Sequence, residues 1–268
     1  MPRMLSFGVL QALVTFLGSG TSHGVPMIGC TCEVCQSPDP HDRRMRPSIY
    51  LEVDGGPSVL VDTSTDLRQQ ALAFGVVKVD AILMTHSHAD HVMGMDEVRR
   101  FNVLNHGAIP VHASAATGSE LRRIFQYVFE PPSQKGGGIP QIVLHGIDGP
   151  FTVGALTVQP IPLLHGTLPI LGYRFGSFAY LTDASTIPDE AWPMLEGLDV
   201  LVLNALRHRS HPTHFSLSEA AAVVERLQPR RAFFTHVCHD LAHAITNRSL
   251  PEGMALAFDG LRFAVEVG

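Results

Sequence analysis

The sequence predicts an α/β fold in which two mixed β-sheets pack face to face and are flanked by helices, giving a sandwich of four layers. Two observations lead to this prediction. Strand and helix patterns alternate along the 268 residues, and several neighbouring strands are separated only by hairpin turns. The strand patterns also fall into two similar halves. At this length an α/β chain often folds as one unit, so we expect a single domain covering residues 1–268.

The first half of the chain contains four strand patterns and three helix patterns. Apolar or alternating runs predict strands at residues 12–17, 48–53, 58–62 and 80–85. Helices are predicted at residues 66–74, 90–101 and 119–129. The turn signal Asp54-Gly55-Gly56-Pro57 predicts a hairpin between the second and third strands. The breaker-rich segment 130–138 is expected to be a mobile flap or a disordered insert.

The second half repeats this mixture. Strand patterns cover residues 141–144, 151–161, 171–182, 199–203, 231–235, 254–258 and 261–265. A helix is predicted at residues 217–227, because Ser216 and Glu219 form a capping-box pattern at its start. Hairpins and helix-linked strands therefore occur in both halves. This predicts that both sheets are mixed and that the helices lie outside them.

The composition is that of an ordinary globular chain. Of its residues 45% are hydrophobic and 16% are charged, and the formal net charge of −6 argues against a protein that coats nucleic acid. No stretch approaches the roughly 18 apolar residues of a membrane span. The apolar beginning, residues 1–17, is interrupted by Gln11 and is interpreted as a first strand and not as a signal peptide. We expect a cytoplasmic protein that does not contact membranes.

Three imidazoles and one carboxylate lie close together in the motif Thr85-His86-Ser87-His88-Ala89-Asp90-His91, directly after the apolar run 81–84. A strand end that opens into a helix can direct several such groups at one point, and His and Asp are common ligands of divalent cations. The alternative is a polar loop rich in histidine, in a chain that contains 15 His residues. The close spacing favours a metal site.

Three further polar residues directly follow apolar runs of strand character. These residues are His165, Asp183 and His236. Side chains at strand ends reach the edge of a sheet, where sites form in α/β folds. Any one of them alone would be an ordinary strand-terminal polar residue. Together with the histidine motif they supply five His and two Asp, which is the number needed for two cations that share a bridging carboxylate.

The cysteines have the spacing of a metal site and not of a disulfide framework. Cys30, Cys32 and Cys35 fall within six positions, whereas Cys238 lies 203 residues after Cys35. Clustering of this kind in a chain of this size indicates metal binding in a reducing compartment. Free thiols in a loop are the alternative.

In type and order these motifs resemble those of the metallo-β-lactamase superfamily, over nearly the whole chain. Gly18-Ser19-Gly20-Thr21-Ser22 and Val61-Asp62-Thr63 belong to the same resemblance. It implies the αββα sandwich and a dinuclear metal site. In that site one metal is held by His86, His88 and His165, the other by Asp90, His91 and His236, and Asp183 bridges the two. Asp62 is then either a carboxylate that orients a ligand imidazole or a plain turn-capping residue.

The segment Gly29-Cys30-Thr31-Cys32-Glu33-Val34-Cys35 resembles the structural-zinc loop of PhnP-type phosphodiesterases. That loop takes its fourth ligand from a His three residues after the last active-site His, and His239 stands at this place. Such a Cys3His site has no open position, so it implies one structural Zn²⁺. Cys238 is then a small buried residue, or it replaces one of the other thiolates.

The resemblance also implies a general acid. His214 stands 22 residues before His236, as the general-acid His does in PhnP-type enzymes. It would give a proton to the leaving alkoxide, and together with the ligand Asp90 it makes up the catalytic residues that we predict. His211 is the competing candidate, and an ordinary surface His is the alternative.

The reaction implied is hydrolysis of a small phosphodiester by a metal-bridging hydroxide, with phosphoribosyl cyclic phosphate or a 2′,3′-cyclic nucleotide as substrate. Two divalent cations, two Asp ligands and one hydroxide leave a net charge of about +1 (4 − 2 − 1), which suits a monoanionic diester. Arg43, Arg44 and Arg46 are either contacts to a substrate phosphate or solvated charges.

Several properties stay open at this stage. The two active-site ions are expected to be Zn²⁺ or Mn²⁺, although Fe²⁺ also accepts such ligands. No large nucleic acid is expected as a partner, since the chain lacks the long arm with which related tRNA-processing enzymes grip tRNA. A homodimer is compatible with the resemblance. The alternatives in function are a thioester or lactone hydrolase of the same fold and a non-catalytic metal-binding module.

Overall fold

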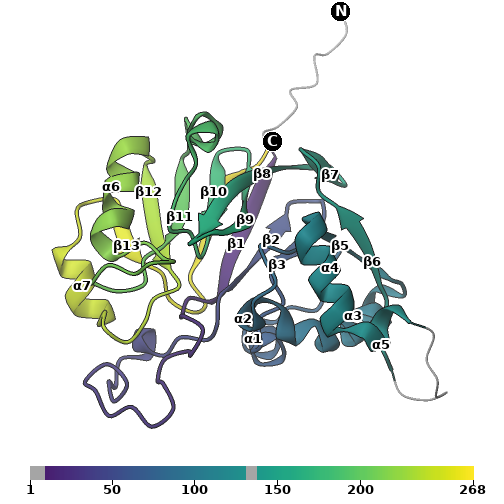
Figure 1. Cartoon of the computed structure of the whole chain (residues 1–268), viewed down its shortest axis with the longest axis horizontal. Helices are drawn as coiled ribbons and strands as arrows, with labels where there is room; N and C mark the ends of the chain where they lie inside the picture. Colours follow the sequence, from purple (N-terminus) through teal and green to yellow (C-terminus); the bar gives the residue numbers. More distant parts are fainter. Residues whose placement is uncertain (1–9, 131–137) are drawn as a thin grey trace, which may run out of the picture.

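Two seven-stranded sheets form the centre of the structure, a computed structural model that describes residues 10–130 and 138–268 (Figure 1). Helices lie against the outer face of each sheet, so the predicted four-layer αββα sandwich is confirmed. The expected flap lies almost entirely outside the described residues. Within those residues, no helix has the length and apolar character that a membrane crossing requires.

The first sheet has the strand order β14-β1-β2-β3-β4-β5-β6. Its strands are β14 (Arg262–Glu266), β1 (Gln11–Gly18), β2 (Ser48–Val53), β3 (Ser58–Val61), β4 (Ala81–Leu83), β5 (Ile109–Ala113) and β6 (Ile142–Gly146). The strands from β14 to β3 pair antiparallel, and those from β3 to β6 pair parallel. The last strand of the chain thus completes the sheet that the first strand begins.

The second sheet repeats this plan in the order β13-β12-β11-β10-β9-β8-β7. Its strands are β13 (Met254–Leu256), β12 (Arg231–Thr235), β11 (Val200–Asn204), β10 (Phe178–Leu181), β9 (Leu168–Phe175), β8 (Leu156–His165) and β7 (Phe151–Val153). The strands from β10 to β13 are parallel, and those from β7 to β10 are antiparallel. Both sheets are therefore mixed.

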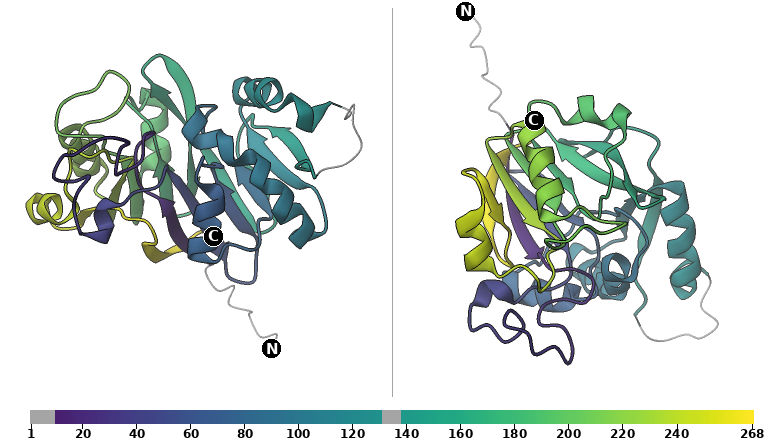
Figure 2. Two further views of the ribbon diagram at one scale, coloured as in Figure 1. Left: turned by 90° about the horizontal axis from the view of Figure 1, so that it is seen from below. Right: turned by 60° about the vertical axis from the view of Figure 1, so that its left-hand side comes forward.

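The helices divide between the two outer faces (Figures 1 and 2). On the first sheet lie α1 (Leu67–Phe74), α2 (Ala89–Val92), α3 (Val98–Asn105), α4 (Ala115–Ile124) and α5 (Gln126–Phe129). On the second lie α6 (Leu217–Leu227) and α7 (His243–Ser249). Short 3-10 segments are η1 (Pro40–Asp42), η2 (Met93–Glu97) and η3 (Asp189–Leu195).

Apolar side chains fill the three spaces between these four layers. Phe16, Tyr173 and Phe178 belong to the cluster between the sheets. A second cluster joins the second sheet to α6, which buries Leu217 and Ala220 among others. A third joins the first sheet to α1, α3 and α4. Because each sheet is covered on both faces, its central strands, such as β10 and β11, are buried along their whole length.

Several predicted boundaries are wrong, and glycine explains two of them. The strands predicted at 151–161 and 171–182 are each two strands, separated by turns at Gly154 and Gly176, where φ is +55° and +54°. The helix predicted at 90–101 is divided into α2, η2 and α3. The helix predicted at 119–129 is divided into α4 and α5 at Phe125. It also begins earlier, because Ser114 caps α4 by accepting a hydrogen bond from the backbone of Thr117. β5, η3 and α7 were not predicted.

Candidate metal centre

The histidine motif lies where β4 passes into α2. His86 follows the buried strand and is itself buried, His88 stands directly before α2, and Asp90 and His91 are inside that short helix. The close approach of η2 holds α2 in place. Gly94 donates a backbone hydrogen bond to the Thr63 carbonyl at 2.9 Å, and its missing side chain makes room for the backbone of Ser64.

The second sheet supplies the remaining predicted residues from its strand ends. His165 ends β8, Asp183 follows β10 and His236 follows β12. All three side chains are buried. Leu171 of β9 donates a backbone hydrogen bond to the Thr85 carbonyl at 3.0 Å, which joins this sheet to the segment that carries the histidine motif.

The seven residues predicted as ligands of the two active-site metals fall into two adjacent groups. Potential donor atoms of His86, His88 and His165 lie within 4.8 Å of one another, and so do those of Asp90, His91, Asp183 and His236. Asp183 also lies in a third such group, with His165 and His214. The carboxylate of Asp183 thus faces both groups, as a bridging ligand would. That these residues bind metal stays a prediction.

The distances within the second group suit a shared cation. Asp183 Oδ1 lies 3.3 Å from His91 Nε2, and Asp183 Oδ2 lies 3.1 Å from His236 Nε2. Asp90 Oδ2 lies 3.4 Å and 3.5 Å from the same two nitrogens. With metal–ligand bonds of about 2.0–2.2 Å and tetrahedral angles, N···O separations of about 3.4 Å are expected.

Buried imidazole nitrogens without hydrogen-bond partners give a second test of whether these residues suit a metal ion. The Nε2 atoms of His86, His91 and His236 are buried and form no hydrogen bond with any residue that the structure describes. Buried polar atoms are normally satisfied, so three orphaned imidazole nitrogens that point at one region call for a ligand there. Neutral imidazole and carboxylate groups suit Zn²⁺, Mn²⁺ or Fe²⁺. The residues present therefore fit divalent cations.

The buried carboxylates of this centre strongly favour positive charge on the groups beside them. Burial disfavours a charged imidazole, yet Asp183 and Asp90 overcome it and raise the pKa of His236 to about 9. The pKa of His91 is raised for the same reason, with Asp62 contributing. When no cation is bound, protons on these two rings supply the positive charge that the carboxylates favour. Metal binding would therefore release these protons.

Asp62 holds His91 from behind. Its Oδ2 lies 2.7 Å from His91 Nδ1, and it accepts hydrogen bonds from the backbone and hydroxyl of Thr85, both at 2.8 Å. Of the two readings of Asp62 taken from the sequence, this contact fits the one in which it orients a ligand imidazole. The bond to Nδ1 leaves Nε2 of His91 facing the centre.

Two supporting residues were missed by the sequence analysis. The Thr213 carbonyl lies 2.6 Å from His165 Nδ1 and fixes that ring. Asn204 exchanges two hydrogen bonds, of 2.7 and 2.9 Å, with the backbone of Ala184, directly after Asp183. Asn204 ends the apolar strand β11, so the signal that identified the other strand ends applies to it also. The carbonyl of Thr213 left no signal in the sequence.

His214 lies beside the two groups and His211 lies farther out. The ring of His214 is 4.5 Å from that of His165 and 4.7 Å from that of His236, and its Nδ1 is 3.9 Å from Asp183 Oδ2. The ring of His211 lies 5.2 Å beyond that of His214, and its Nδ1 accepts a hydrogen bond from the backbone N–H of Thr213. Burial, with the neighbouring His236, lowers the pKa of His214 to about 3. Its isolated imidazole is therefore neutral.

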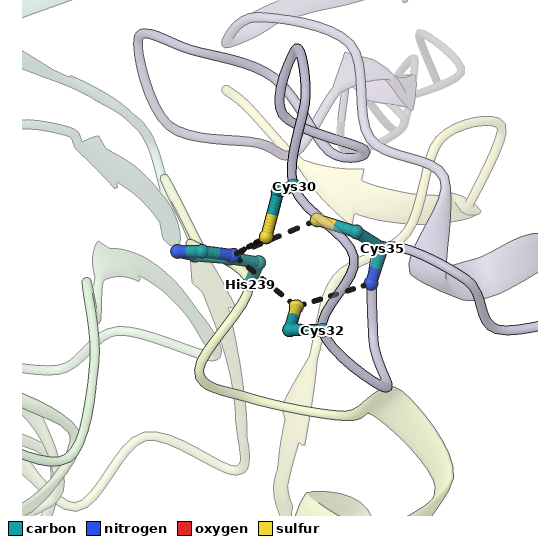
Figure 3. Close-up of side chains that lie close together, drawn as sticks. All are labelled: Cys30, Cys32, Cys35 and His239. Carbon is teal, nitrogen blue, oxygen red and sulfur yellow. Dashed lines mark hydrogen bonds between the residues drawn. The ribbon is translucent and has the colours of Figure 1, made fainter.

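The predicted structural-zinc residues also come together (Figure 3). The Nδ1 atom of His239 lies 3.3, 3.3 and 3.5 Å from the sulfurs of Cys30, Cys32 and Cys35. A tetrahedral Zn²⁺ with Zn–S of about 2.3 Å and Zn–N of about 2.0–2.1 Å requires N···S separations of about 3.5 Å. The four residues therefore fit such an ion. Cys238 is not in this group.

Arg44 anchors the loop that carries the cysteines. It is buried, lies 2.9 Å from Asp42, and donates to the carbonyls of Cys238 and Leu241 at 2.8 and 2.7 Å. Neither sequence interpretation of Arg44, a phosphate contact or a solvated charge, is therefore right. Arg46 pairs with Asp66 at 3.0 Å.

Comparisons with known proteins agree with this architecture. Residues 58–237 match the model of the β-lactamase superfamily domain. A solved structure described as a new diphosphatase from the PhnP family is 47% identical, covers 96% of this chain and 99% of its own, and superposes with a TM-score of 0.90. Zn²⁺-bound PqqB from Methylobacterium extorquens is 19% identical with a TM-score of 0.77, over 94% of this chain and 99% of its own, which is a likeness of fold alone.

Curated relatives are longer than this chain. An octanoyltransferase of Porphyromonas gingivalis is 37% identical over 252 residues, which are 93% of this chain but only 51% of that protein. A coenzyme PQQ synthesis protein B of Methylobacterium nodulans is 34% identical over 103 residues, 34% of each protein. The chain thus spans about half or less of the length of these two curated relatives.

Proposed function

The chain belongs to the PhnP family of the metallo-β-lactamase superfamily, and on this basis we propose that it is a metal-dependent hydrolase of small phosphodiesters. A 2′,3′-cyclic nucleotide or a phosphoribosyl cyclic phosphate is the substrate class. The proposal places two divalent ions, Zn²⁺ or Mn²⁺, at the strand ends that carry the seven predicted ligands, and one structural Zn²⁺ in the cysteine loop.

The observation that supports this proposal best is the junction of the two donor groups at Asp183. Paired divalent cations at such a junction would supply an activated water and neutralise charge on phosphoryl oxygens. The chain itself positions the ligands. Asp62 and the Thr213 carbonyl each bond to the Nδ1 of a ligand imidazole, of His91 and His165 respectively, so that its Nε2 is free for the centre.

His214 is the residue of this chain that can protonate the leaving oxygen. It is closer to the ligand groups than His211, which supports the choice between the two. With a pKa of about 3, its imidazole is neutral near pH 7. A phosphodiester bound beside it supplies negative charge, which favours the protonated imidazole.

Leaving-group dependence tests this role. In a His214→Ala variant the rate on an alkyl diester, whose leaving alkoxide needs a proton, should fall about 10²- to 10⁴-fold. The rate on bis-p-nitrophenyl phosphate should fall much less, because p-nitrophenolate leaves unaided. Equal losses on both substrates would remove His214 from the acid role, and the same loss pattern in His211→Ala would transfer the role to that residue.

The proposed function is tested by metal content together with turnover. Plasma emission on protein purified without chelator should give about three metals per chain, and stripping the two exchangeable ions should abolish hydrolysis of a 2′,3′-cyclic nucleotide. Asp183→Asn should remove activity, whereas His106→Asn, at an exposed histidine, should retain it. Fully loaded protein that cleaves a thioester or a lactone but no phosphodiester would contradict the proposal.

A second candidate reaction is hydrolysis of a diphosphate. It is favoured by one observation, that the 47% identical relative is described as a diphosphatase. The same centre would then act on a P–O–P bond and not on a P–O–C bond. A dinucleoside diphosphate assayed beside the cyclic nucleotide separates the two reactions, because the preferred substrate has the higher kcat/KM.

A further inference from the structure

The loop that carries the three cysteines, residues 19–39, projects from one end of the molecule (Figures 1 and 2). Cys30 and Cys32 are half-buried there, and their neighbours Thr31 and Glu33 are exposed. Cys35 is buried. A small dissolved oxidant can therefore approach the Cys3His group from solvent. Thiolates that bind Zn²⁺ are deprotonated, which is the form of cysteine that reacts with peroxides.

Two of the three sulfurs are placed to form a disulfide (Figure 3). Cys32 and Cys35 have the C-x-x-C spacing that occurs in reversible protein disulfides. The backbone N–H of Cys35 donates to the sulfur of Cys32 at 3.4 Å, so both residues belong to one turn, and their sulfurs lie within 4.8 Å of each other. A bridge from Cys30 to Cys32 would close a smaller ring across a single residue and would be more strained.

Besides the proposed Zn²⁺, two features hold this loop. Its outer part packs around a small apolar cluster, whose buried members are Val25, Val34 and Cys35, while Ile28 is fully exposed. Arg44 holds its base. The backbone of Arg44 exchanges hydrogen bonds of 2.7 and 2.9 Å with Val25, and its buried side chain donates to carbonyls of the segment after β12. These bonds do not involve the zinc ligands, so loss of Zn²⁺ would loosen the outer loop and leave its base folded.

His239 connects the loop to the predicted active centre. It stands three residues after His236, a predicted ligand of the exchangeable metals. Between them, Val237 donates a backbone hydrogen bond to the Ser19 carbonyl at 2.9 Å and accepts one from Thr21 at 3.2 Å. In the described part of the chain the ring of His236 has no hydrogen-bond partner, and its backbone φ is +56°. The position of His236 therefore depends on this short backbone segment, one end of which the structural Zn²⁺ would fix.

We propose that Cys32 and Cys35 form a redox switch, in which a peroxide oxidises both thiolates to a disulfide and the structural Zn²⁺ is released. The inference rests on the structural Zn²⁺ of the proposed function and not on its substrate. The Cys32 thiolate attacks one peroxide oxygen, which gives a sulfenic acid and hydroxide. The Cys35 thiolate then attacks the sulfur of Cys32, forms the S–S bond and expels a second hydroxide.

The electrons and the metal ligands both balance in this reaction. The two sulfurs lose two electrons, the peroxide gains them, and two protons convert the hydroxides to water. Zn²⁺ keeps only Cys30 and His239 of its four ligands and dissociates. A thiol reductant reverses the reaction by exchange. Release of Zn²⁺ frees one end of the segment 236–239, so the exchangeable metals are bound more weakly at His236.

Peroxide treatment tests the switch on protein that holds Zn²⁺ at the cysteines and Mn²⁺ in the exchangeable sites. A colorimetric chelator should detect about one Zn²⁺ released per chain, and mass spectrometry of unreduced peptides should find a Cys32–Cys35 bond. Titration against a competing chelator should show that the oxidised protein binds Mn²⁺ about 10-fold more weakly. Dithiothreitol with added Zn²⁺ should restore the affinity. Cys238→Ser removes the thiol outside the group and should behave as the wild type does.

Retention of Zn²⁺ under peroxide, or a disulfide that joins other cysteines, would overturn the switch. An unchanged Mn²⁺ affinity in the oxidised protein would refute its link to the active centre. The metal content of the reduced protein is measured first, and absence of Zn²⁺ there would contradict both the structural ion and the switch. Absence of phosphodiester turnover would contradict only the proposed reaction, because Zn²⁺ release and the disulfide are measured without substrate.

Discussion

Two substitutions of Asp62 should separate its effect on metal affinity from its effect on the stability of the fold. Its carboxylate is buried, accepts two hydrogen bonds from Thr85 and lies 2.7 Å from His91 Nδ1. Its backbone has φ of +64°, in the left-handed region that Asn tolerates and Ala does not. Asp62→Ala removes the acceptor and conflicts with the backbone. Asp62→Asn keeps an acceptor and suits the backbone, but removes the charge.

The structure sets different magnitudes for the two variants. In Asp62→Ala the buried Thr85 N–H and His91 Nδ1 lose their acceptor, at about 1–3 kcal/mol each, and the backbone conflict adds up to about 1 kcal/mol. Together these losses come to about 2–7 kcal/mol, which at about 2–4 °C per kcal/mol lowers the Tm of the metal-free protein by about 4–28 °C.

Asp62→Asn should leave the metal-free stability within about 1 kcal/mol of the wild type. Burial raises the pKa of Asp62 against the opposing effect of His91, so the ionised carboxylate lowers stability as the pH rises through that pKa. A neutral amide avoids this loss and offsets the weaker hydrogen bonding.

Both variants should bind the active-site metal about 10- to 100-fold more weakly, because the carboxylate that orients His91 is gone. Thermal unfolding of metal-free protein and titration against a competing chelator measure the two quantities separately. If Asp62→Asn unfolds as early as Asp62→Ala, or if both variants bind metal as tightly as the wild type, the role derived for Asp62 is wrong.

Three other substitutions test separate parts of the structure. Cys35→Ser should lower the metal content by one per chain without removing the exchangeable pair, and an unchanged content would exclude Cys35 as a ligand. Burial, with His41 and Arg44, lowers the pKa of His243 to about 4, so stability is lost as the pH falls from about 6.5 through 4. The variant His243→Gln should therefore show a smaller difference than the wild type between the urea midpoints of unfolding at pH 7 and pH 5. Gly94→Ala places a Cβ against the Ser64 carbonyl and should lower both Tm and metal affinity, whereas Gly118→Ala meets nothing within 4 Å and should leave Tm equal or higher.

Local signals predicted the elements that depend on local interactions. The helix predicted at 217–227 is found at those residues, because the Ser216–Glu219 capping box fixes its first turn. The helix predicted at 90–101 failed because tertiary contacts decide that segment. Gly94 packs on Ser64, and the chain there is a 3-10 segment. β5 was missed because it is only five residues long and contains Pro110 and His112.

The expectation that polar residues directly after buried strands gather at one sheet edge, here called the strand-end rule, located the centre because it reflects topology. Parallel strands bring their carboxyl ends to one edge, so a polar residue after each buried run reaches the same place. This argument applies to His86, Asp183 and His236 and would also have identified Asn204. The rule does not predict distances.

Backbone conformation shows how the strand ends direct their side chains. Three of the centre's residues, Asp62, Asp183 and His236, have φ between +56° and +64°, directly or two residues after a strand. Non-glycine residues in this region cost of order 1–3 kcal/mol each, with Asp among the more tolerant. Glycine would relieve the strain but would supply no carboxylate or imidazole. The conformation ends each strand with an abrupt turn that places its side chain in the centre. We therefore expect His236, whose ring has neither nitrogen satisfied by another described residue, to depend most on a bound cation for its place.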